Sequence, residues 1–484
     1  MNIDTGDTAW VLVSAALVLL MTPGLAFFYG GMVRVKSVLN MMMMSFGAMA
    51  TIGVIWVLWG YSQTFGESVG GRGLVGNPFD HFGLAGLLGD DAIVGTVPTL
   101  AFVAFQAMFA IIAVALISGA IADRTKFRTW MVFTAVWATI VYFPVAHWVF
   151  AFDGVAAERG GWIANSLKAL DFAGGTAIHI NAGAAALALV LVVGNRHGFR
   201  TEAMRPHNLT LVMLGAGLLW FGWFGFNAGS ALGANGTAAL AFVNTLAATA
   251  AACCGWLIVE HLRDGHATSL GAASGIVAGL VAVTPAANSV TPVGAVAIGV
   301  LSGALCALAV GLKHRFGYDD SLDVVGVHLV GGLSGTVLIG LFASASTPGG
   351  VDGVFYGGGT DQLWRQAVGA VAVMAFSFVV TFLIGKALNA TMGFRVDRDA
   401  ELEGVDLTEH AETAYELLAA RGVRTAVSRL EHAHANAGDR HDTSTAQSHD
   451  RAERPAGYEP ATQEPAQDPF GTTHAVTKDA GANR

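Results

Sequence analysis

Long apolar stretches recur along the chain up to about residue 390, and they limit what it can fold into. About 20 apolar residues suffice for a helix to cross a bilayer, where backbone polar groups must find partners inside the protein. Only 13% of the residues are charged, against about 25% in soluble domains. We therefore predict an all-α polytopic membrane protein with eleven transmembrane helices, roughly at 9–31, 38–61, 95–121, 128–150, 173–194, 207–231, 236–260, 267–284, 292–312, 324–345 and 364–391.

The distribution of Lys and Arg between loops predicts the orientation, because cytoplasmic loops carry an excess of these residues. Loops after the odd-numbered stretches up to the ninth hold eleven Lys and Arg, and loops after the even-numbered stretches hold four. We therefore expect the N-terminus outside and the C-terminus in the cytoplasm, with the protein in the cytoplasmic (inner) membrane. The opening MNIDTGDT is acidic, unlike the basic start of a signal peptide.

A change in composition near residue 395 predicts three regions. Residues 1–394 would form the membrane domain, and residues 395–425 a polar cytoplasmic tail with a weak helical pattern. Residues 426–484 carry few large apolar side chains, so we expect this extension to be disordered.

Two histidines inside apolar stretches are the strongest functional signal, because ionisable groups at membrane depth are costly and mark transport pathways. His179 lies in DFAGGTAIHINAG, in the fifth stretch, and His328 lies in DDSLDVVGVHLVGG, in the tenth. Five helices repeated once would give a 5+5 inverted repeat plus one helix, with the working site where the halves meet. Each histidine alone is equally well explained as a hydrogen-bonded core residue; the pair favours function.

The residues near these histidines indicate neither a metal nor a cofactor. The three cysteines, Cys253, Cys254 and Cys306, lie in apolar segments without metal-binding spacing. A neutral imidazole both donates and accepts a hydrogen bond, and its pKa of about 6.5 suits proton transfer. No cluster of basic residues indicates nucleic-acid binding. The sequence also has no nucleophile elbow, P-loop or dinucleotide motif, so an enzyme is not expected.

An aromatic face lies in the sixth stretch, GLLWFGWFGFNAGSALGAN, where Trp223, Phe226 and Ser230 share one side of a helix. Cation–π attraction of roughly 0.5–2 kcal/mol cannot offset the roughly 20 kcal/mol idealised cost of burying a bare ion. An ammonium ion avoids that cost by losing a proton, after which neutral ammonia passes an apolar section. Potassium has no proton to lose, so such a pore would reject it.

Several long motifs in order resemble the ammonium transporter (Amt/Mep/Rh) family, of the bacterial Amt type, over residues 5 to about 415. They are PGLAFFYGG, FQAMFAIIAVALISGAIADR, DFAGGTAIHINAG, GWFGFNAGSA, AFVNTLAATAAA, GLVAVTPA and DDSLDVVGVHLVGG. The resemblance implies a homotrimer with one pore per subunit, which transports ammonium or ammonia and takes methylammonium as an analogue.

Motif position also implies roles for single residues. The resemblance gives a pore lined by His179, His328 and Trp223, a phenylalanine gate of Phe109 and Phe226, and an outer recruitment site of Ser230, Phe150 and Asp171. For Asp171 we favour a helix-capping role, which is compatible with recruitment. Asp323 is expected to start the tenth helix.

The recruitment site departs from the family pattern, in which a Trp occupies the position of Phe150, in AHWVF. Phe is a weaker cation–π partner than Trp. Either Phe150 serves with lower affinity, or Trp162, beyond a short insertion, folds back into the site.

The stretch EGVDLTEHAETAYE, residues 403–416, resembles the family's regulatory tail, where PII-type signal proteins dock. The implied tail residues are Gly404, Asp406, His410, Glu412 and Tyr415. Two other function classes stay open: a channel for another small neutral molecule, such as ammonia, methylamine or carbon dioxide, and an ammonium sensor.

Overall fold

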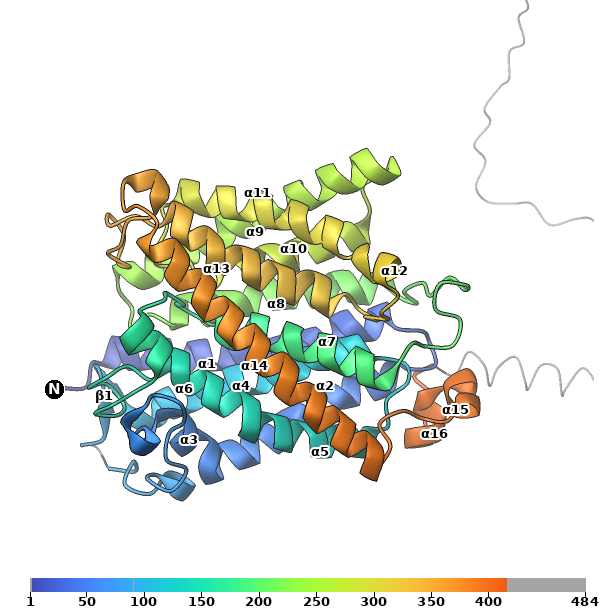
Figure 1. Ribbon diagram of the computed structural model, residues 1–484, viewed down its shortest axis with the longest axis horizontal. Helices are drawn as coiled ribbons and strands as arrows, with labels where there is room; N and C mark the ends of the chain where they lie inside the picture. The colour runs from blue at the N-terminus through green and yellow to red at the C-terminus, as the bar shows by residue number, and fades with distance from the viewer. Residues whose placement is uncertain (1, 90, 416–484) are drawn as a thin grey trace, which may run out of the picture. The chain divides into compact units, whose positions relative to one another are not determined.

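The computed structural model describes residues 2–89 and 91–415, which form a helical bundle (Figure 1). The predictions for residues 426–484, and for the tail beyond residue 415, lie outside the described residues. A two-stranded antiparallel ribbon, β1 (Ile93–Val94) and β2 (Val97–Pro98), pairs Ile93 with Pro98 and Val94 with Val97.

The α-helices follow one another along the chain, and several of the connections between them are long. They are α1 (Thr5–Met32), α2 (Val38–Ile55), α3 (Tyr61–Phe65), α4 (Thr99–Ile117), α5 (Phe127–Trp137), α6 (Phe143–Phe150), α7 (Asn181–Val193), α8 (Leu209–Gly229), α9 (Gly236–Asp264), α10 (Ser269–Val283), α11 (Pro292–Ala309), α12 (Leu312–Phe316), α13 (Val330–Phe342), α14 (Asp361–Thr391), α15 (Arg398–Glu403) and α16 (Val405–His410).

Wider π-helical turns join or begin several of these helices. Residues Trp56–Gly60 connect α2 to α3, and Ala138–Tyr142 connect α5 to α6, so each pair forms one continuous membrane-length helix. Residues Gly175–Ile180 lead into α7, and Val325–Leu329 lead into α13. π-Turns of this kind occur often at functional sites, and the last two contain the histidines.

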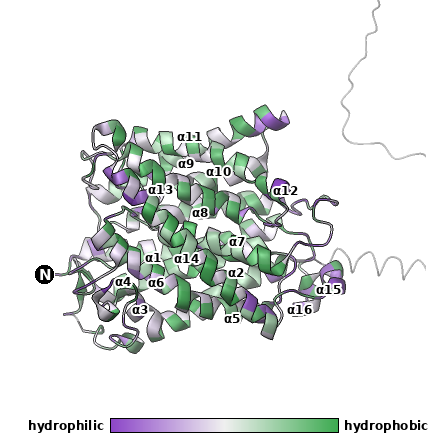
Figure 2. Ribbon diagram, viewed as in Figure 1, coloured by the Kyte–Doolittle hydropathy of each residue, from purple (hydrophilic) through white to green (hydrophobic). Residues whose placement is uncertain are grey.

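Within the described residues, ten helices are long and apolar enough to cross a membrane. An additional apolar helix, α10, stands where the eighth stretch is predicted, but it has 15 residues. That is about 22 Å of helix, short of the roughly 30 Å of hydrocarbon. Figure 2 shows hydrophobic ribbon along the middle of the bundle and hydrophilic residues gathered towards its two ends. The sequence therefore predicts the membrane class correctly.

Side-chain caps explain where five of the helices begin. A free N–H group at a helix start needs an acceptor, and Ser, Thr, Asp and Asn supply one. The capping residues are Asp4 for α1, Asn208 for α8, Asn235 for α9, Thr268 for α10 and Thr291 for α11.

Glycine allows α9 and α11 to pack with their backbones in contact. A Cβ atom at Gly299 or Gly303 of α11 would lie 2.2 Å or 2.3 Å from the carbonyl oxygens of Ala248 and Ala252 on α9. Small residues at four-residue spacing are typical of membrane helix contacts. Gly217 of α8, in contrast, has only open space around the corresponding position.

A buried ion network joins loops at the end of the bundle that carries α12, α15 and α16. The Arg196 guanidinium contacts Asp123 at 2.9 Å and Asp319 at 2.8 Å, and Arg34 contacts Asp123 at 3.3 Å. Burial acts to raise the pKa of Asp123, but Arg196 and Arg34 hold it below its ordinary value. Buried charges are tolerated only when paired in this way, so the network fixes the loops between helices.

The contact between α9 and α11 predicts a large effect of adding a side chain at Gly303. Gly303→Val should lower the melting temperature of the purified protein, because overpacking costs about 1–3 kcal/mol. Gly217→Val is the matched control, because that position is open. Equal melting temperatures for the two variants in detergent would show that α9 and α11 do not depend on this close approach.

Candidate functional site

The two predicted histidines meet in the interior, although 149 positions separate them in the sequence. Their Nδ1 atoms lie 3.3 Å apart, and the rings are nearly parallel, with centroids 5.4 Å apart. Both side chains are buried. No group of three His, Cys, Asp or Glu side chains that could hold a metal ion occurs in residues 2–89 and 91–415.

Each histidine follows a helix start that is held by a buried carboxylate eight residues earlier. Asp171 accepts hydrogen bonds from the N–H groups of Gly174, Gly175, Thr176 and Ala177, and from the Thr176 hydroxyl. Asp320 accepts from the N–H groups of Val324 and Val325 at 3.0 Å and 2.7 Å. These carboxylates satisfy backbone donors that would otherwise be unpaired inside the protein.

The expected start residue of the tenth helix is therefore wrong: Asp320 caps it, and Asp323 does not. The Asp323 carboxylate instead forms an ion pair of 2.6 Å with Lys313, and its backbone is in the left-handed region, with φ 62°. Burial, together with the charge of Asp323, raises the pKa of Asp320. The sequence did carry the correct signal, because the spacing from Asp320 to His328 equals that from Asp171 to His179.

Two equivalent glycines let the histidine-bearing segments cross. Gly183 and Gly332 each follow a histidine by four residues. A Cβ atom at Gly183 would lie 2.5 Å from the Leu329 nitrogen, and one at Gly332 would lie 3.1 Å from the His179 Cβ. Because each glycine faces the opposite segment, the two halves make reciprocal contacts around the imidazoles.

Aromatic side chains from α8 and α4 continue the row of rings beyond His179. The Trp223 ring stacks on His179 with centroids 5.4 Å apart, and Phe226 lies 6.1 Å from the same imidazole. Phe226 in turn packs on Phe109 at 4.4 Å. The Trp223 indole donates to the Thr284 hydroxyl at 2.8 Å, so its polar edge is satisfied and its orientation is fixed.

A cavity adjoins this row at Phe109, and Phe150 and Ser230 both line it. The Ser230 hydroxyl donates to the Phe226 carbonyl at 2.8 Å, which leaves the lone pairs of its oxygen as acceptors. Other lining residues had no predicted role, among them Gln106, Phe152 and Phe172. Gln106 lies in the FQAMFA motif, and this membership could have marked it as a candidate site residue. Phe152 lies in the insertion between Phe150 and Trp162 and belongs to no motif that could have marked it.

Trp162 and Asp171 do not line that cavity. The Trp162 ring packs on Trp148 with centroids 5.8 Å apart, and Asp171 uses its oxygens on the helix start. Burial raises the pKa of the Asp171 carboxyl, and the hydrogen bonds from Thr176 and neighbouring N–H groups oppose that rise. The structure thus brings Phe150 and Ser230 together and keeps the other two candidates outside the lining.

The predicted tail residues lie against loops and helix starts of the bundle. Asp406 accepts from the N–H groups of Leu39 and Asn40 at the start of α2, and His410 contacts the Asn40 side chain at 3.0 Å. Tyr415 contacts His207 at 3.1 Å. Gly404 adopts φ 134°, and Glu412 is exposed, with its N–H 3.4 Å from the Asp406 carbonyl.

Comparisons with known proteins place the chain in a family. The family model described as Ammonium Transporter Family matches residues 9–415, and the chain belongs to this family. It is 60% identical over 440 residues to an ammonium transporter of Mycobacterium tuberculosis (strain ATCC 25618 / H37Rv), covering 87% of this chain and 92% of the relative. It is 45% identical over 414 residues to an ammonium transporter of Bacillus subtilis (strain 168), covering 85% and 98%.

Solved structures agree with this assignment. A sensor Amt protein matches with a TM-score of 0.77 at 30% identity, covering 84% of this chain and 98% of that one. Mep2 of Candida albicans matches with a TM-score of 0.74 at 34% identity, covering 82% and 88%. The bundle therefore has the Amt/Mep fold of multi-pass membrane proteins.

The capped helix starts give a paired prediction. Asp171→Ala and Asp320→Ala should both lower the melting temperature, because each leaves buried N–H groups without an acceptor, at a cost of about 1–3 kcal/mol per group. Asp323→Ala removes only a partly exposed ion pair and should have the smaller effect. A loss for Asp323→Ala that equals the other two would contradict the assignment of the caps.

Proposed function

We propose that the protein transports ammonium or ammonia across the cytoplasmic membrane, by recruiting the cation outside and passing ammonia along the histidine pair. The observation that carries this proposal is the continuous row of Phe109, Phe226, His179 and His328, which begins at a cavity with a hydroxyl acceptor. Ammonium transport also agrees with the family and with the names of its relatives.

The cavity supplies the recruitment step. The Ser230 oxygen accepts a hydrogen bond from ammonium, and the Phe150 and Phe109 faces attract its charge. Phe150 takes this role rather than Trp162, because only Phe150 lines the cavity. Asp171 supports the site indirectly by fixing the segment that leads to His179.

The gate and the pore select the neutral species. Phe109 and Phe226 are buried, with ring centroids 4.4 Å apart, so a hydrated cation must lose its water to pass them. Aromatic attraction is too weak to repay that loss, whereas ammonium can give up a proton and cross as ammonia. Potassium has no equivalent route, which gives selectivity between two cations of similar size.

The contact between the imidazoles fixes how they can act. Of two neutral rings joined through Nδ1, one donates and the other accepts. The donor ring then presents a bare Nε2 acceptor, and the other presents an Nε2–H donor. The pair therefore offers ammonia one acceptor and one donor. When the bare Nε2 takes up a proton, the Nδ1 proton of that ring passes to the other ring, whose Nε2 releases its own proton, and the order of donor and acceptor is reversed. This alternation is the proposed route for a relayed proton.

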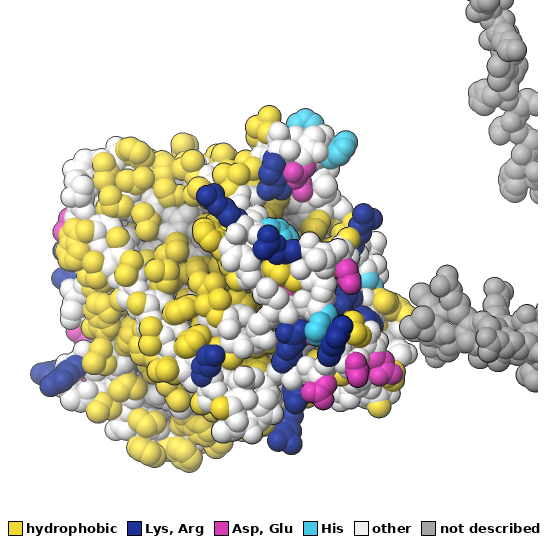
Figure 3. Space-filling model, turned by 45° about the vertical axis from the view of Figure 1, so that its right-hand side comes forward, with side chains coloured by type: hydrophobic (Ala, Val, Ile, Leu, Met, Phe, Trp, Pro, Cys, Tyr) yellow, Lys and Arg dark blue, Asp and Glu magenta, His cyan; other side chains and the backbone are white. Residues whose placement is uncertain are grey.

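We also propose an inverted 5+5 repeat plus one helix, with eleven spans in all, counting α10 as the eighth. Reciprocal packing supports it: α7 contacts the residues before α13, and α13 contacts the residues before α7. Many Lys and Arg side chains gather towards the end of the bundle that carries α12, α15 and α16 (Figure 3). This excess supports placing that end in the cytoplasm. A homotrimer is the assembly implied by the family.

A cytoplasmic regulatory tail formed by residues 395–425 is the last part of the proposal. Asp406 fastens the tail to α2, and the Glu409 carboxylate accepts from the Phe127 N–H at 2.9 Å at the start of α5. These contacts support a fixed platform for a PII-type signal protein, because they hold α16 against the bundle.

Transport is tested with ammonium-evoked current from protein reconstituted on a solid-supported membrane. We expect current for ammonium and none for potassium, because only ammonium can be deprotonated at the gate. His179→Ala and His328→Ala should each abolish the current or alter its selectivity, because each removes half of the relay. Trp162→Phe, away from the cavity, serves as the control variant.

Unchanged current and selectivity in a well-folded His179→Ala, His328→Ala double variant would disprove the relay. Ammonia-dependent alkalinisation of the vesicle lumen without current would instead indicate a neutral channel. Absence of both signals for the wild-type protein would refute ammonium transport.

Docking of the signal protein is tested with Asp406→Ala, which uncaps α2 and should release α16. We expect weaker binding of a purified trimeric PII protein in a surface-capture assay. Asp399→Ala removes an exposed carboxylate of α15 and should leave binding unchanged. Undiminished PII binding after Asp406→Ala would contradict the proposed platform.

A further inference from the structure

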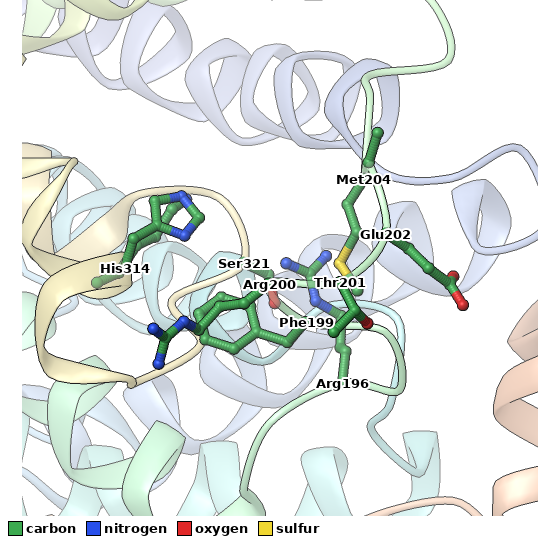
Figure 4. A pocket seen from close by; sticks show the side chains of 10 residues that line it. Arg196, Phe199, Arg200, Thr201, Glu202, Met204, His314 and Ser321 are labelled. Carbon is green, nitrogen blue, oxygen red and sulfur yellow. The ribbon is translucent and has the colours of Figure 1, made fainter.

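A second cavity, separate from the histidine row, lies between the loop after α7 and the short helix α12. Its volume is about 570 Å³, within the range of about 300–1,000 Å³ for small-molecule sites. The residues that line it include Arg196, Phe199, Arg200, Lys313, His314 and Ser321. Figure 4 shows the labelled lining residues, with His314 on the helix and Arg196, Phe199 and Arg200 on the loop.

The charges that face this cavity are mainly positive. Arg196, Arg200 and Lys313 line it, and the single acidic lining residue is Glu202. A Cβ atom at Gly198 would lie 2.6 Å from the Glu202 carboxylate, so that carboxylate folds onto its own loop. Figure 4 shows it directed away from the other labelled side chains.

The carboxylates that balance the network lie behind the cavity wall. Asp123 and Asp319, the partners of Arg196, have fully buried side chains and do not line the cavity. Lys313 is also paired, with the partly exposed Asp323 at 2.6 Å, so the charges of Arg196 and Lys313 are already balanced within the protein. An anion entering the cavity therefore depends on a cation that has no carboxylate partner of this kind.

Arg200 is the cation available to bind such an anion. Its side chain is exposed, and the ion pairs found among the described residues do not include it. Its backbone adopts φ 69°, a conformation that is uncommon for a residue with a long side chain. A Cβ atom at Gly317 would lie 3.8 Å from an Arg200 guanidinium nitrogen, so this side chain reaches from the loop to the end of α12.

The walls of the cavity are tied together, so the site is formed without a ligand. The Asn195 amide donates to the Gly317 carbonyl at 3.1 Å, and its oxygen accepts from the Asp319 N–H at 3.1 Å. Phe199 stacks on His314 with centroids 5.8 Å apart and an angle of 12°. This stack joins the two walls and fixes the position of the imidazole.

From this geometry we propose that the cavity binds a phosphate-bearing anion, with Arg200 as the principal ligand and His314 as a second donor. A guanidinium presents paired N–H groups that match two phosphate oxygens. The cavity is larger than one phosphate, so it takes a phosphate ester. The ester is either a soluble metabolite or the headgroup of an anionic lipid, because both carry the same group.

The test uses the full-length protein in nonionic detergent, titrated calorimetrically with pyrophosphate and with ADP. Arg200→Ala should weaken binding about tenfold or more, since a hydrogen bond to a charged group contributes about that factor. Arg128→Ala removes an exposed arginine of α5 that does not line the cavity and should leave the affinity unchanged. Gel filtration of each variant checks that the fold is intact.

A parallel arm adds phosphatidylglycerol or phosphatidylcholine and follows the melting temperature. A shift with phosphatidylglycerol alone, lost in Arg200→Ala, together with no binding of the soluble probes, assigns the site to a lipid headgroup. Binding of pyrophosphate or ADP that Arg200→Ala weakens assigns it to a soluble ester. The proposal is overturned by no response to any of these probes, or by responses that Arg200→Ala leaves unchanged. Neither result bears on transport, which is measured separately.

Discussion

Backbone hydrogen bonding in a medium without water is the constraint on which this structure depends. Most of the chain satisfies it with long helices, but the segments that carry the histidines begin inside the protein. There, free N–H groups need acceptors. Asp171 and Asp320 supply them, and each carboxylate sets the position of an imidazole eight residues later. The geometry of the histidine pair thus rests on two side chains that do not line the cavity beside Phe109.

The same helix starts require close approach between the halves of the bundle. Gly183 and Gly332 leave room for the opposite segment, and the imidazoles then come within 3.3 Å of each other. Larger side chains at either glycine would separate the rings. The distance between the two imidazoles is therefore determined by the backbone packing at these glycines as well as by the histidine side chains.

The sequence predicted the membrane class, because apolar length is a local signal. It also predicted that His179 and His328 meet, because they occupy matching positions in the fifth and tenth apolar stretches. It could not locate Phe152 in the cavity lining, since that placement depends on how an inserted loop folds over α4 and α8. It also misassigned Asp323, where two nearby aspartates looked alike and only tertiary contacts distinguished a cap from an ion pair.

The order in which the aromatic residues stack on the histidines could not be predicted from the sequence either. Spacing along α8 placed Trp223, Phe226 and Ser230 on one face, but the orientation of Trp223 depends on the Thr284 hydroxyl of a distant segment. The sequence also could not exclude Trp162 from the recruitment site, because its contact with Trp148 depends on the tertiary fold. The role of a residue whose partners lie far along the chain can be assigned only from the three-dimensional structure.

The attachment of Asp406 to the start of α2 has a consequence for biosynthesis. The residue that completes this helix start is translated 366 positions after Asn40, which receives its hydrogen bond. The first turn of α2 can therefore receive this hydrogen-bond acceptor only after Asp406 has been synthesised. Chains interrupted before this point carry an unfinished helix end at the membrane surface, which distinguishes them physically from completed ones.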